Sequence, residues 1–383
     1  MKQVLMIAGE ASGDIYGADL ARHLFKKVPL KISGVGGKRM KDAGIDILLD
    51  SSEVSVIGLF EILPRLKAIR RAYRIIRDFI ISRKLDLIIL IDFPGFNIRI
   101  AGLAKKAGIP VVYYISPQIW ASRKSRLRLL RNRVKKMIVI LPFEEAIYKE
   151  AGIDCSFIGH PLVDEILSVR PLEETIKRYD LNINNPVIGL LPGSRIGEIR
   201  SLLFDILDAA YILKKDNPKI QFIMAVADSL DYNLIDGIIS GWRISKKGDA
   251  NHMEVKLVWG EANDVLNVSN VVIAASGTIT LQAALLEKPM VILYRLSTLT
   301  YLVARLIVKV KDIGLVNILA GRRIVPELIQ KDVTPEKIAG EVKKILYDRI
   351  YYNRIKNELH EVRLKLGPPG TSERVAKVIA GML

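Results

Sequence analysis

The stretch Val4-Leu5-Met6-Ile7-Ala8-Gly9-Glu10-Ala11-Ser12-Gly13-Asp14 decides the fold class of this chain. A short apolar run is typical of a strand buried on both faces, and here a glycine-containing turn follows it and leads into a helical segment. The same succession recurs after the apolar runs Leu87–Ile91, Val111–Ile115, Met137–Leu141, Val187–Leu191, Phe222–Val226, Val271–Ala275 and Met290–Leu293. This alternation predicts an α/β protein with parallel sheets, whose ligands bind beyond the carboxyl ends of the strands.

The length of the chain predicts two domains. A chain of 383 residues, half of them hydrophobic, is too long for one compact core. We expect an N-terminal Rossmann-like lobe over residues 1–165 and a C-terminal Rossmann-like lobe over residues 185–360. The charged segment 167–186, which ends in asparagines and a proline, is predicted to connect them. The C-terminal helices, at about 360–383, are expected to pack back on the first lobe.

Composition narrows the surroundings and the partners. The 58 lysines and arginines exceed the 41 acidic residues and leave a net charge of +17, which favours nucleic acid, acidic lipid or phosphorylated substrates as partners. A single cysteine, Cys155, excludes an intrachain disulfide and a cysteine metal cluster, and favours the cytoplasm. We expect no signal peptide, because the first apolar run, Val4–Ala8, is too short for its hydrophobic region. We also expect no membrane span, because no apolar run reaches the ~18 residues that a spanning helix needs.

Two loops of the first half carry candidate site residues. The glycines and serine of Gly9–Asp14 let the backbone approach a ligand, although plain turn chemistry explains such a loop equally well. Asp92 follows an aliphatic run at the edge where clefts form, so it is a candidate general base. The alternative is a cap for the helix that starts near Asn97. Pro94 and Gly95 place Asp92 too far upstream for that role, which favours catalysis.

The second half carries two further turns. Leu190–Arg195 combines a glycine, a hydroxyl and an arginine before a helix, a set that suits a diphosphate. Ala274–Gln282 places Ser276, Gly277 and Thr278 between a strand and a helix, where either an anion or a simple helix cap explains them. His160 is a candidate site-lining or structural residue.

The sequence lends no support to a bound metal or cofactor. It contains no Asp-x-Asp, and its four histidines are scattered. If the ligand contains a diphosphate leaving group, its negative charge would then be stabilised by arginine, lysine and helix N-termini.

Two basic stretches and one apolar stretch are candidates for contact with a membrane surface. Residues 61–84 set apolar residues at helical spacing against five arginines, and more than half of residues 122–136 are basic. The first pattern is typical of a helix in a membrane interface, or of a core-facing helix with a solvated basic face. The apolar stretch Leu296–Val310 needs cover from the other lobe, a second subunit or lipid chains.

Taken together, these motifs resemble the lipid-A-disaccharide synthase family. The resemblance runs in order from the first strand to near the C-terminus, through Gly9–Asp14, Ile91–Asn97, Tyr114–Ala121, Phe157–Pro161, Leu190–Arg195, Ala275–Thr278 and Asn317–Gly321. It implies a GT-B fold and an inverting, metal-independent glycosyltransferase without a cofactor. By this resemblance, UDP-2,3-diacylglucosamine would donate its sugar to the 6-hydroxyl of 2,3-diacylglucosamine 1-phosphate, yielding the β-1,6 lipid A disaccharide phosphate and UDP.

The resemblance also implies roles for particular residues. Asp92 would be the base, and Glu10 would act beside it in catalysis. The other residues expected to bind substrate are Ser12, Asn97, His160, Arg195, Ser276, Gly277, Thr278, Gln282 and Asn317, with Arg195 and the Ser276–Thr278 turn holding UDP. One departure is Gln282, since proteins of this kind often have a glutamate there that accepts hydrogen bonds from ribose hydroxyls. A neutral amide would bind ribose less strongly.

The charge and the acylated substrates together predict peripheral docking on the cytoplasmic face of an anionic inner membrane, and a homodimer is left open. The closest enzymatic rival is a UDP-N-acetylglucosamine 2-epimerase, which uses the same two-lobed fold. It would need no lipid acceptor and does not account for the Asp92 motif. A basic RNA-binding protein is the rival of a different class. No RRM or KH signature is present, and the arginine-rich stretches lack regular aromatic partners, so we expect no nucleic-acid binding.

Overall fold

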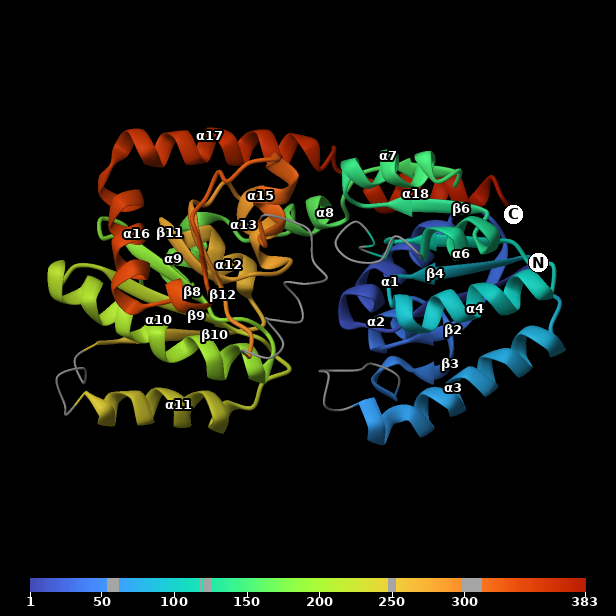
Figure 1. Ribbon diagram of the computed structural model, residues 1–383, viewed down its shortest axis with the longest axis horizontal. Coiled ribbons are helices and arrows are strands. Elements are labelled where there is room, and N and C mark those ends of the chain that lie inside the picture. Colours follow the sequence, from blue (N-terminus) through green and yellow to red (C-terminus); the bar gives the residue numbers. More distant parts are fainter. Residues whose placement is uncertain (54–61, 118, 120–125, 247–252, 298–311) are drawn as a thin grey trace. The chain divides into compact units, whose positions relative to one another are not determined.

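The computed structural model describes residues 1–53, 62–117, 119, 126–246, 253–297 and 312–383 (Figure 1). By internal contacts the chain divides into two compact units. The first contains Met1–Val163 and Leu366–Leu383, and the second contains Asp164–Lys365.

The first unit is built on a parallel sheet of seven strands. Its order is β3-β2-β1-β4-β5-β6-β7. The strands are β1 (Lys2–Ala8), β2 (Leu30–Gly36), β3 (Asp46–Asp50), β4 (Leu87–Ile91), β5 (Val111–Tyr114), β6 (Lys136–Val139) and β7 (Cys155–Phe157). All pairs are parallel, so the loops after β1, β4 and β5 leave the sheet at one edge.

Helices cover both faces of this sheet. They are α1 (Ala11–Phe25), α2 (Lys38–Asp42), α3 (Ile62–Ser82), α4 (Pro94–Lys106), α6 (Arg126–Arg133), α7 (Pro142–Glu150) and α18 (Thr371–Ala380), and a short 3-10 turn, η1 (Ser51–Glu53), precedes α3. Successive residues of β1 point to opposite faces. Leu5 and Ile7 therefore join the core cluster that includes residues of α3 and α4, whereas Val4 and Met6 join the cluster that includes residues of α1 and α18.

The second unit repeats this architecture with a parallel sheet of six strands. The order is β10-β9-β8-β11-β12-β13. The strands are β8 (Val187–Leu191), β9 (Gln221–Val226), β10 (Val255–Trp259), β11 (Val271–Ala275), β12 (Met290–Tyr294) and β13 (Glu327–Ile329). Its helices are α9 (Leu172–Arg178), α10 (Ile196–Asp216), α11 (Tyr232–Ser245), α12 (Ala262–Val268), α13 (Ile279–Leu285), α15 (Leu315–Ala320), α16 (Pro335–Tyr347) and α17 (Arg349–Lys365), with the 3-10 turn η3 (Gln330–Asp332).

The chain passes between the units twice, once through α8 (Leu162–Ile166) and once between α17 and α18. Val375, Ala376 and Ile379 of α18 are buried in the same cluster as Leu20 and Leu24 of α1. The return to the first unit begins at Leu366, later than the predicted 360, because α17 continues to Lys365 against α13, α15 and α16.

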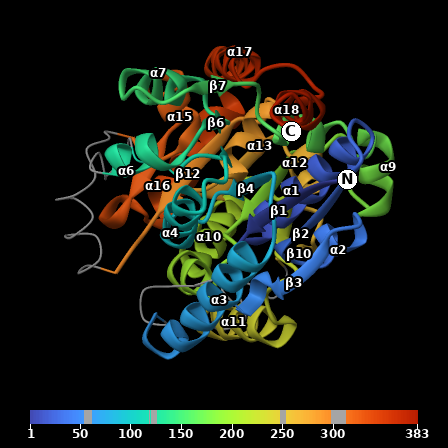
Figure 2. The same cartoon turned by 90° about the vertical axis from the view of Figure 1, so that its right-hand side faces the viewer.

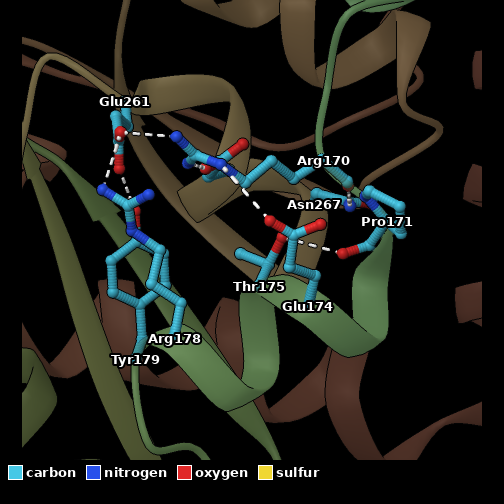
Figure 3. A network of polar contacts seen from close by, with 9 residues as sticks. Arg170, Pro171, Glu174, Thr175, Arg178, Tyr179, Glu261 and Asn267 are labelled. Carbon is cyan, nitrogen blue, oxygen red and sulfur yellow. Dashed lines mark hydrogen bonds and ion pairs between the residues drawn. The ribbon is translucent and has the colours of Figure 1, made fainter.

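The segment 167–186, predicted to connect the lobes, belongs instead to the second unit. Polar contacts hold it there (Figure 3). Arg170 and Arg178 each donate a hydrogen bond of 3.0 Å to Glu261, just before α12, and Tyr179 also donates to Glu261. Asn267 of α12 donates to the backbone oxygen of Arg170 at 2.9 Å. The connection was misplaced because a charged, turn-rich sequence is compatible with both a linker and an ion-paired surface helix.

None of the described helices is long and apolar enough to cross a membrane. Of the apolar stretch 296–310 only Leu296 and Ser297 lie within the described residues, and the basic stretch 122–136 is described from Arg126 onward. The basic amphipathic stretch 61–84 contains helix α3, and α4 lies alongside it (Figure 1 and Figure 2).

We predict that Gly34→Ala destabilises the protein. Gly34 pairs with Met6 across β1 and β2, and a Cβ at this position would lie 1.8 Å from the backbone oxygen of Met6. The two strands would have to separate, so the free energy of unfolding in urea should fall by roughly 2 kcal/mol or more.

Gly237→Ala in α11 is the matched control. A Cβ there meets no atom within 4 Å. Alanine also favours a helix over glycine by up to about 1 kcal/mol, so this variant should be as stable as the original protein or more stable. Equal stabilities for the two variants would contradict the close approach at Gly34.

Candidate active site

Asp92 stands at the carboxyl end of β4 with an unusual backbone. Its φ is +45°, and the next residue, Phe93, has a φ of +48°. These left-handed values are uncommon for residues other than glycine and cluster at functional sites, where surrounding contacts hold the strain. The strained turn lifts Asp92 out of the strand before α4 begins at Pro94.

Buried polar groups hold this turn. The Tyr113 hydroxyl donates to the backbone oxygen of Asp92 at 2.6 Å, and the Asn97 amide donates to the same oxygen at 2.8 Å and to that of Ile91 at 3.2 Å. The backbone N–H of Asp92 donates to Tyr114 at 3.1 Å. Asn97 is 0% exposed, so it positions Asp92. The expectation that Asn97 contacts substrate does not fit this burial.

The loop after β1 lies against the Asp92 turn. A Cβ on Gly9 would be 2.4 Å from the ring of Phe93, so only glycine allows this approach. Glu10 and Ser12 are exposed. Asp14 of the same motif has a structural role, because its carboxylate accepts hydrogen bonds from the backbone N–H groups of Gly37, Arg39 and Met40 at the start of α2.

The carboxyl group of Asp92 has an altered acidity. Burial, and after it the negative charge of Glu10, raise its pKa to about 6, against the opposing effect of a hydrogen bond from the Phe93 N–H. Asp92 is therefore ionised at neutral pH but is a stronger base than an ordinary aspartate. This is the property that a general base needs.

His160 is buried where the chain leaves the first unit. It is 2% exposed, and its Nδ1 accepts a hydrogen bond of 3.1 Å from the backbone N–H of Leu162. Its own backbone N–H donates to Leu366 at 2.8 Å, where the chain returns to the first unit. Burial lowers its pKa to about 3, so the ring is neutral. Its burial does not favour the expected substrate contact, which stays a prediction.

In the second unit the turn before α10 exposes Arg195. Glu198 accepts hydrogen bonds from the backbone N–H groups of Ser194 (3.1 Å) and Arg195 (3.4 Å), and one from the Arg195 guanidinium (3.2 Å). Gly193 has a φ of +114° and passes close to the Glu198 carboxylate. Glu198 thus takes up the backbone donors of this turn, which leaves the guanidinium as the group that reaches solvent.

The Ser276–Thr278 turn stands between β11 and α13. The Ser276 hydroxyl donates to the backbone oxygen of Ile313 at 3.3 Å. Thr278 is exposed and makes no capping hydrogen bond with its side chain. The hydroxyl of Thr280 donates to the backbone oxygen of Gly277 at 2.8 Å. A side-chain cap therefore does not explain the hydroxyl residues at 276 and 278.

Gln282 lines a polar pocket of about 230 Å³ at the carboxyl ends of β10 and β11. Its Nε2 donates to Oε1 of Glu165 and to Oδ1 of Asn263, both at 3.1 Å, and Asn263 donates to Glu165 at 3.3 Å. Glu165 and Asn263 were missed in the sequence. They lie 117 and 19 residues from Gln282, and only the charge of Glu165 next to the Gly159–His160 motif hinted at a role.

Asn317 was expected near the donor but belongs to the core. It is 0% exposed. Its Nδ2 donates to the Val325 oxygen (3.0 Å) and to Glu327 (2.7 Å), and its Oδ1 accepts from the backbone N–H groups of Ile324 (2.9 Å) and Val325 (3.1 Å). Its amide nitrogen and oxygen are bonded within the unit, and a ligand contact for Asn317 stays a prediction. Among the described residues, no group of three or more His, Cys, Asp or Glu side chains is placed to hold a metal ion.

Two units with parallel Rossmann-like sheets place the chain in the GT-B class, as predicted. Solved structures agree. A UDP-GlcNAc 2-epimerase from Neisseria meningitidis has a TM-score of 0.68 at 13% identity and covers 99% of this chain and 100% of its own. A glycosyltransferase from Rickettsia africae has a TM-score of 0.59 at 13% identity and covers 99% of this chain and 97% of its own. At such low identity these likenesses define the fold alone.

Sequence relatives define the family. A family model described as lipid-A-disaccharide synthetase matches residues 4–376. Lipid-A-disaccharide synthases from Geobacter sulfurreducens and Syntrophus aciditrophicus are 41% and 42% identical, over 100% and 98% of this chain and 97% and 96% of their own lengths. The chain belongs to the lipid-A-disaccharide synthase family. The resemblance found in the ordered motifs is confirmed, and the rival readings as an epimerase and as an RNA-binding protein are set aside.

We predict that Glu10→Gln lowers the pKa of Asp92. Removing the neighbouring negative charge makes the ionised carboxylate less unfavourable, so Asp92 should titrate below about 6. The measurement is ¹³C NMR of the Asp92 carboxyl carbon, assigned by comparison with Asp92→Asn. Glu53→Gln, which alters the partner of Arg71, is the control and should leave this titration unchanged. An unchanged or higher pKa in Glu10→Gln would show that the two carboxylates do not interact.

Proposed function

We propose that this protein is a glycosyltransferase of lipid A biosynthesis that moves 2,3-diacylglucosamine from UDP-2,3-diacylglucosamine to the 6-hydroxyl of 2,3-diacylglucosamine 1-phosphate. The products are the β-1,6-linked disaccharide 1-phosphate and UDP. The observation that carries this proposal is the match to relatives named lipid-A-disaccharide synthase along the whole chain. The substrates, the inverting course and the residue roles below are parts of the proposal.

Asp92 acts as the general base. It takes the proton of the acceptor 6-hydroxyl while that oxygen attacks the anomeric carbon of the donor, and UDP leaves from the opposite face. One displacement inverts the anomeric centre through an oxocarbenium-like transition state. Burial and Glu10 keep Asp92 basic, and the hydrogen bonds from Tyr113 and Asn97 keep it in place.

Arg195 stabilises the departing diphosphate without a metal ion. Its guanidinium is exposed and donates a hydrogen bond of 3.2 Å to Glu198. Phosphate oxygens attract a guanidinium through charge-assisted, often bidentate hydrogen bonds, so Arg195 can turn from Glu198 to the donor. Ser276, Gly277 and Thr278 complete the diphosphate side of the site.

Glu165 provides the carboxylate for the ribose hydroxyls of UDP. A diol donates two hydrogen bonds, and a carboxylate accepts them better than the neutral amide at Gln282 does. Gln282 and Asn263 both donate to Oε1 of Glu165, so they hold this carboxylate in the polar pocket. Glu165 of α8 thereby supplies the negative charge that a glutamate at position 282 would carry.

The reaction takes place at the cytoplasmic face of the inner membrane, with the protein bound peripherally. Both substrates carry acyl chains and negative charge, which matches the net charge of +17 and the arginines of α3.

We predict that Asp92→Asn loses ~100-fold or more of the activity, since general base catalysis contributes about that much. The assay follows disaccharide formation from the two proposed substrates in detergent with EDTA present. Asp78→Asn, which changes an exposed carboxylate paired with Arg77, is the control and should keep full activity.

The pH dependence provides a second readout of the same base. In the unchanged protein kcat/KM should fall as the pH drops below about 6, because a protonated Asp92 cannot accept the hydroxyl proton. No disaccharide from the folded wild-type protein would refute the proposed function. Full activity in Asp92→Asn would refute the role of Asp92 alone.

We predict that exchanging the carboxylate and the amide in the polar pocket preserves donor binding. Glu165→Gln should raise KM for the UDP-sugar ~10-fold or more, because hydrogen bonds to a charged group are lost. Gln282→Glu places a second carboxylate where the amide nitrogen now lies 3.1 Å from Glu165, and should also raise this KM.

The double variant Glu165→Gln with Gln282→Glu restores one carboxylate and one amide. Its KM for the donor should return to within a few-fold of the original value, while KM for the acceptor stays unchanged throughout. Additive losses in the double variant would show that Glu165 does not replace a carboxylate at position 282.

A further inference from the structure

A groove of about 420 Å³ lies between α3 and α4 in the first unit, on helices that lie side by side in both views (Figure 1 and Figure 2). None of its side chains has a part in the catalytic steps above. Its lining consists of three apolar side chains and three arginines, namely Ile69, Tyr73 and Phe96 with Arg70, Arg74 and Arg99.

Helical spacing explains this arrangement. Ile69 and Tyr73 are four residues apart, so they lie on one face of α3, and an arginine follows each of them. On α4, Phe96 and Arg99 are three residues apart and also share a face. Phe96 is 3% exposed, and Ile69 and Tyr73 pack against the same core cluster. The arginines are exposed. The groove therefore has an apolar floor and a basic rim.

The positive charge of the rim is not neutralised by the part of the chain that the structure describes. No described carboxylate lies within 4.0 Å of the side-chain nitrogens of Arg70, Arg74 or Arg99, whereas Arg71 and Arg77 on the same helix pair with Glu53 and Asp78. Three guanidinium groups above an apolar floor complement an anion joined to hydrocarbon.

The groove adjoins the proposed base. Phe96 stacks on Phe93, the residue after Asp92, with ring centroids 5.5 Å apart. Arg99 is five residues beyond Pro94, where α4 begins, which corresponds to about 7.5 Å along the helix axis. A molecule that presents a hydroxyl to Asp92 can thus place another part of itself over this groove.

We propose that this groove binds the acceptor, with Arg70, Arg74 and Arg99 contacting its 1-phosphate and the apolar floor contacting an acyl chain. This inference rests on the proposed function. In the acceptor the reacting 6-hydroxyl is attached through C6 to C5, and the phosphate is attached to C1, so both groups are next to the ring oxygen. The acyl chains are on positions 2 and 3 of the same ring. Its chemistry is an anion next to hydrocarbon, which is the chemistry that the groove complements.

The test compares two acceptors, 2,3-diacylglucosamine 1-phosphate and its analogue without the phosphate, in a neutral detergent. Arg74→Gln and Arg99→Gln should each raise KM for the phosphorylated acceptor ~10-fold or more, because each removes a charge-assisted hydrogen bond. KM for the donor should not change. Because neither arginine contacts a reacting atom, kcat should change by less than about 3-fold. For the analogue, the variants and the original protein should have equal KM values.

Arg77→Gln is the matched control. This residue is on α3, outside the groove, and it pairs with Asp78. It should leave both acceptor KM values unchanged. Sedimentation with anionic and neutral vesicles, without substrate, separates substrate binding from general attraction to a membrane.

Several outcomes would overturn the inference. An equal rise in KM for both acceptors would mean that the arginines do not contact the phosphate. Unchanged KM values, with vesicle binding lost in Arg74→Gln and Arg99→Gln but not in Arg77→Gln, would assign the rim to the membrane surface. An inactive wild-type protein would refute the proposed function instead. Equilibrium binding of the phosphorylated lipid to the original protein and to both variants then tests the groove without turnover, and equal affinities would refute it.

Discussion

Parallel pairing of every strand in both sheets is the constraint on which the rest of this structure depends. It brings loops that are far apart in the sequence to one edge of each sheet. In the first unit the loop after β1 meets the loop after β4, where Gly9 lies against Phe93. Glu10 therefore comes close enough to Asp92 to raise the pKa of its carboxyl group. In the second unit the same constraint gathers the turns that follow β8, β10 and β11.

Burial separates the polar residues of this edge into two kinds. Asn97 and Asn317 are fully buried amides, and each donates hydrogen bonds to backbone oxygens. Burying a polar group is costly without such bonds, so these residues organise the loops around them. Glu10 and Arg195 are exposed polar side chains, which suits groups that meet a substrate. Asp92 is intermediate in burial. Its backbone oxygen accepts a hydrogen bond from Tyr113, and its carboxyl group is partly desolvated.

The distribution of charge gives the net +17 a local meaning. Many basic residues are paired on the surface, as Arg170 and Arg178 are with Glu261. Such pairs connect α9 to the start of α12. Because the opposite charges largely cancel, they attract a charged ligand only weakly. The rim of the groove between α3 and α4 is different, because its arginines stand over apolar side chains and have no described acidic neighbours. A phosphorylated amphiphile is the class of molecule that meets both requirements.

The sequence by itself determined the fold class, the strands and the family. These depend on local patterns, such as the apolar run Leu87–Ile91 and the ordered turn motifs. Such patterns can be recognised without knowing which distant residues are in contact. It also singled out Asp92 by its place after a strand. Only the tertiary structure decided which distant residues meet. The backbone of His160 bonds to Leu366 in the returning segment, and the segment 167–186 bonds to α12 through Arg170. Glu165 bonds to Gln282, 117 positions away. The reason is physical: burial and hydrogen bonding are set by chain segments from elsewhere, and no local pattern encodes which segment will arrive.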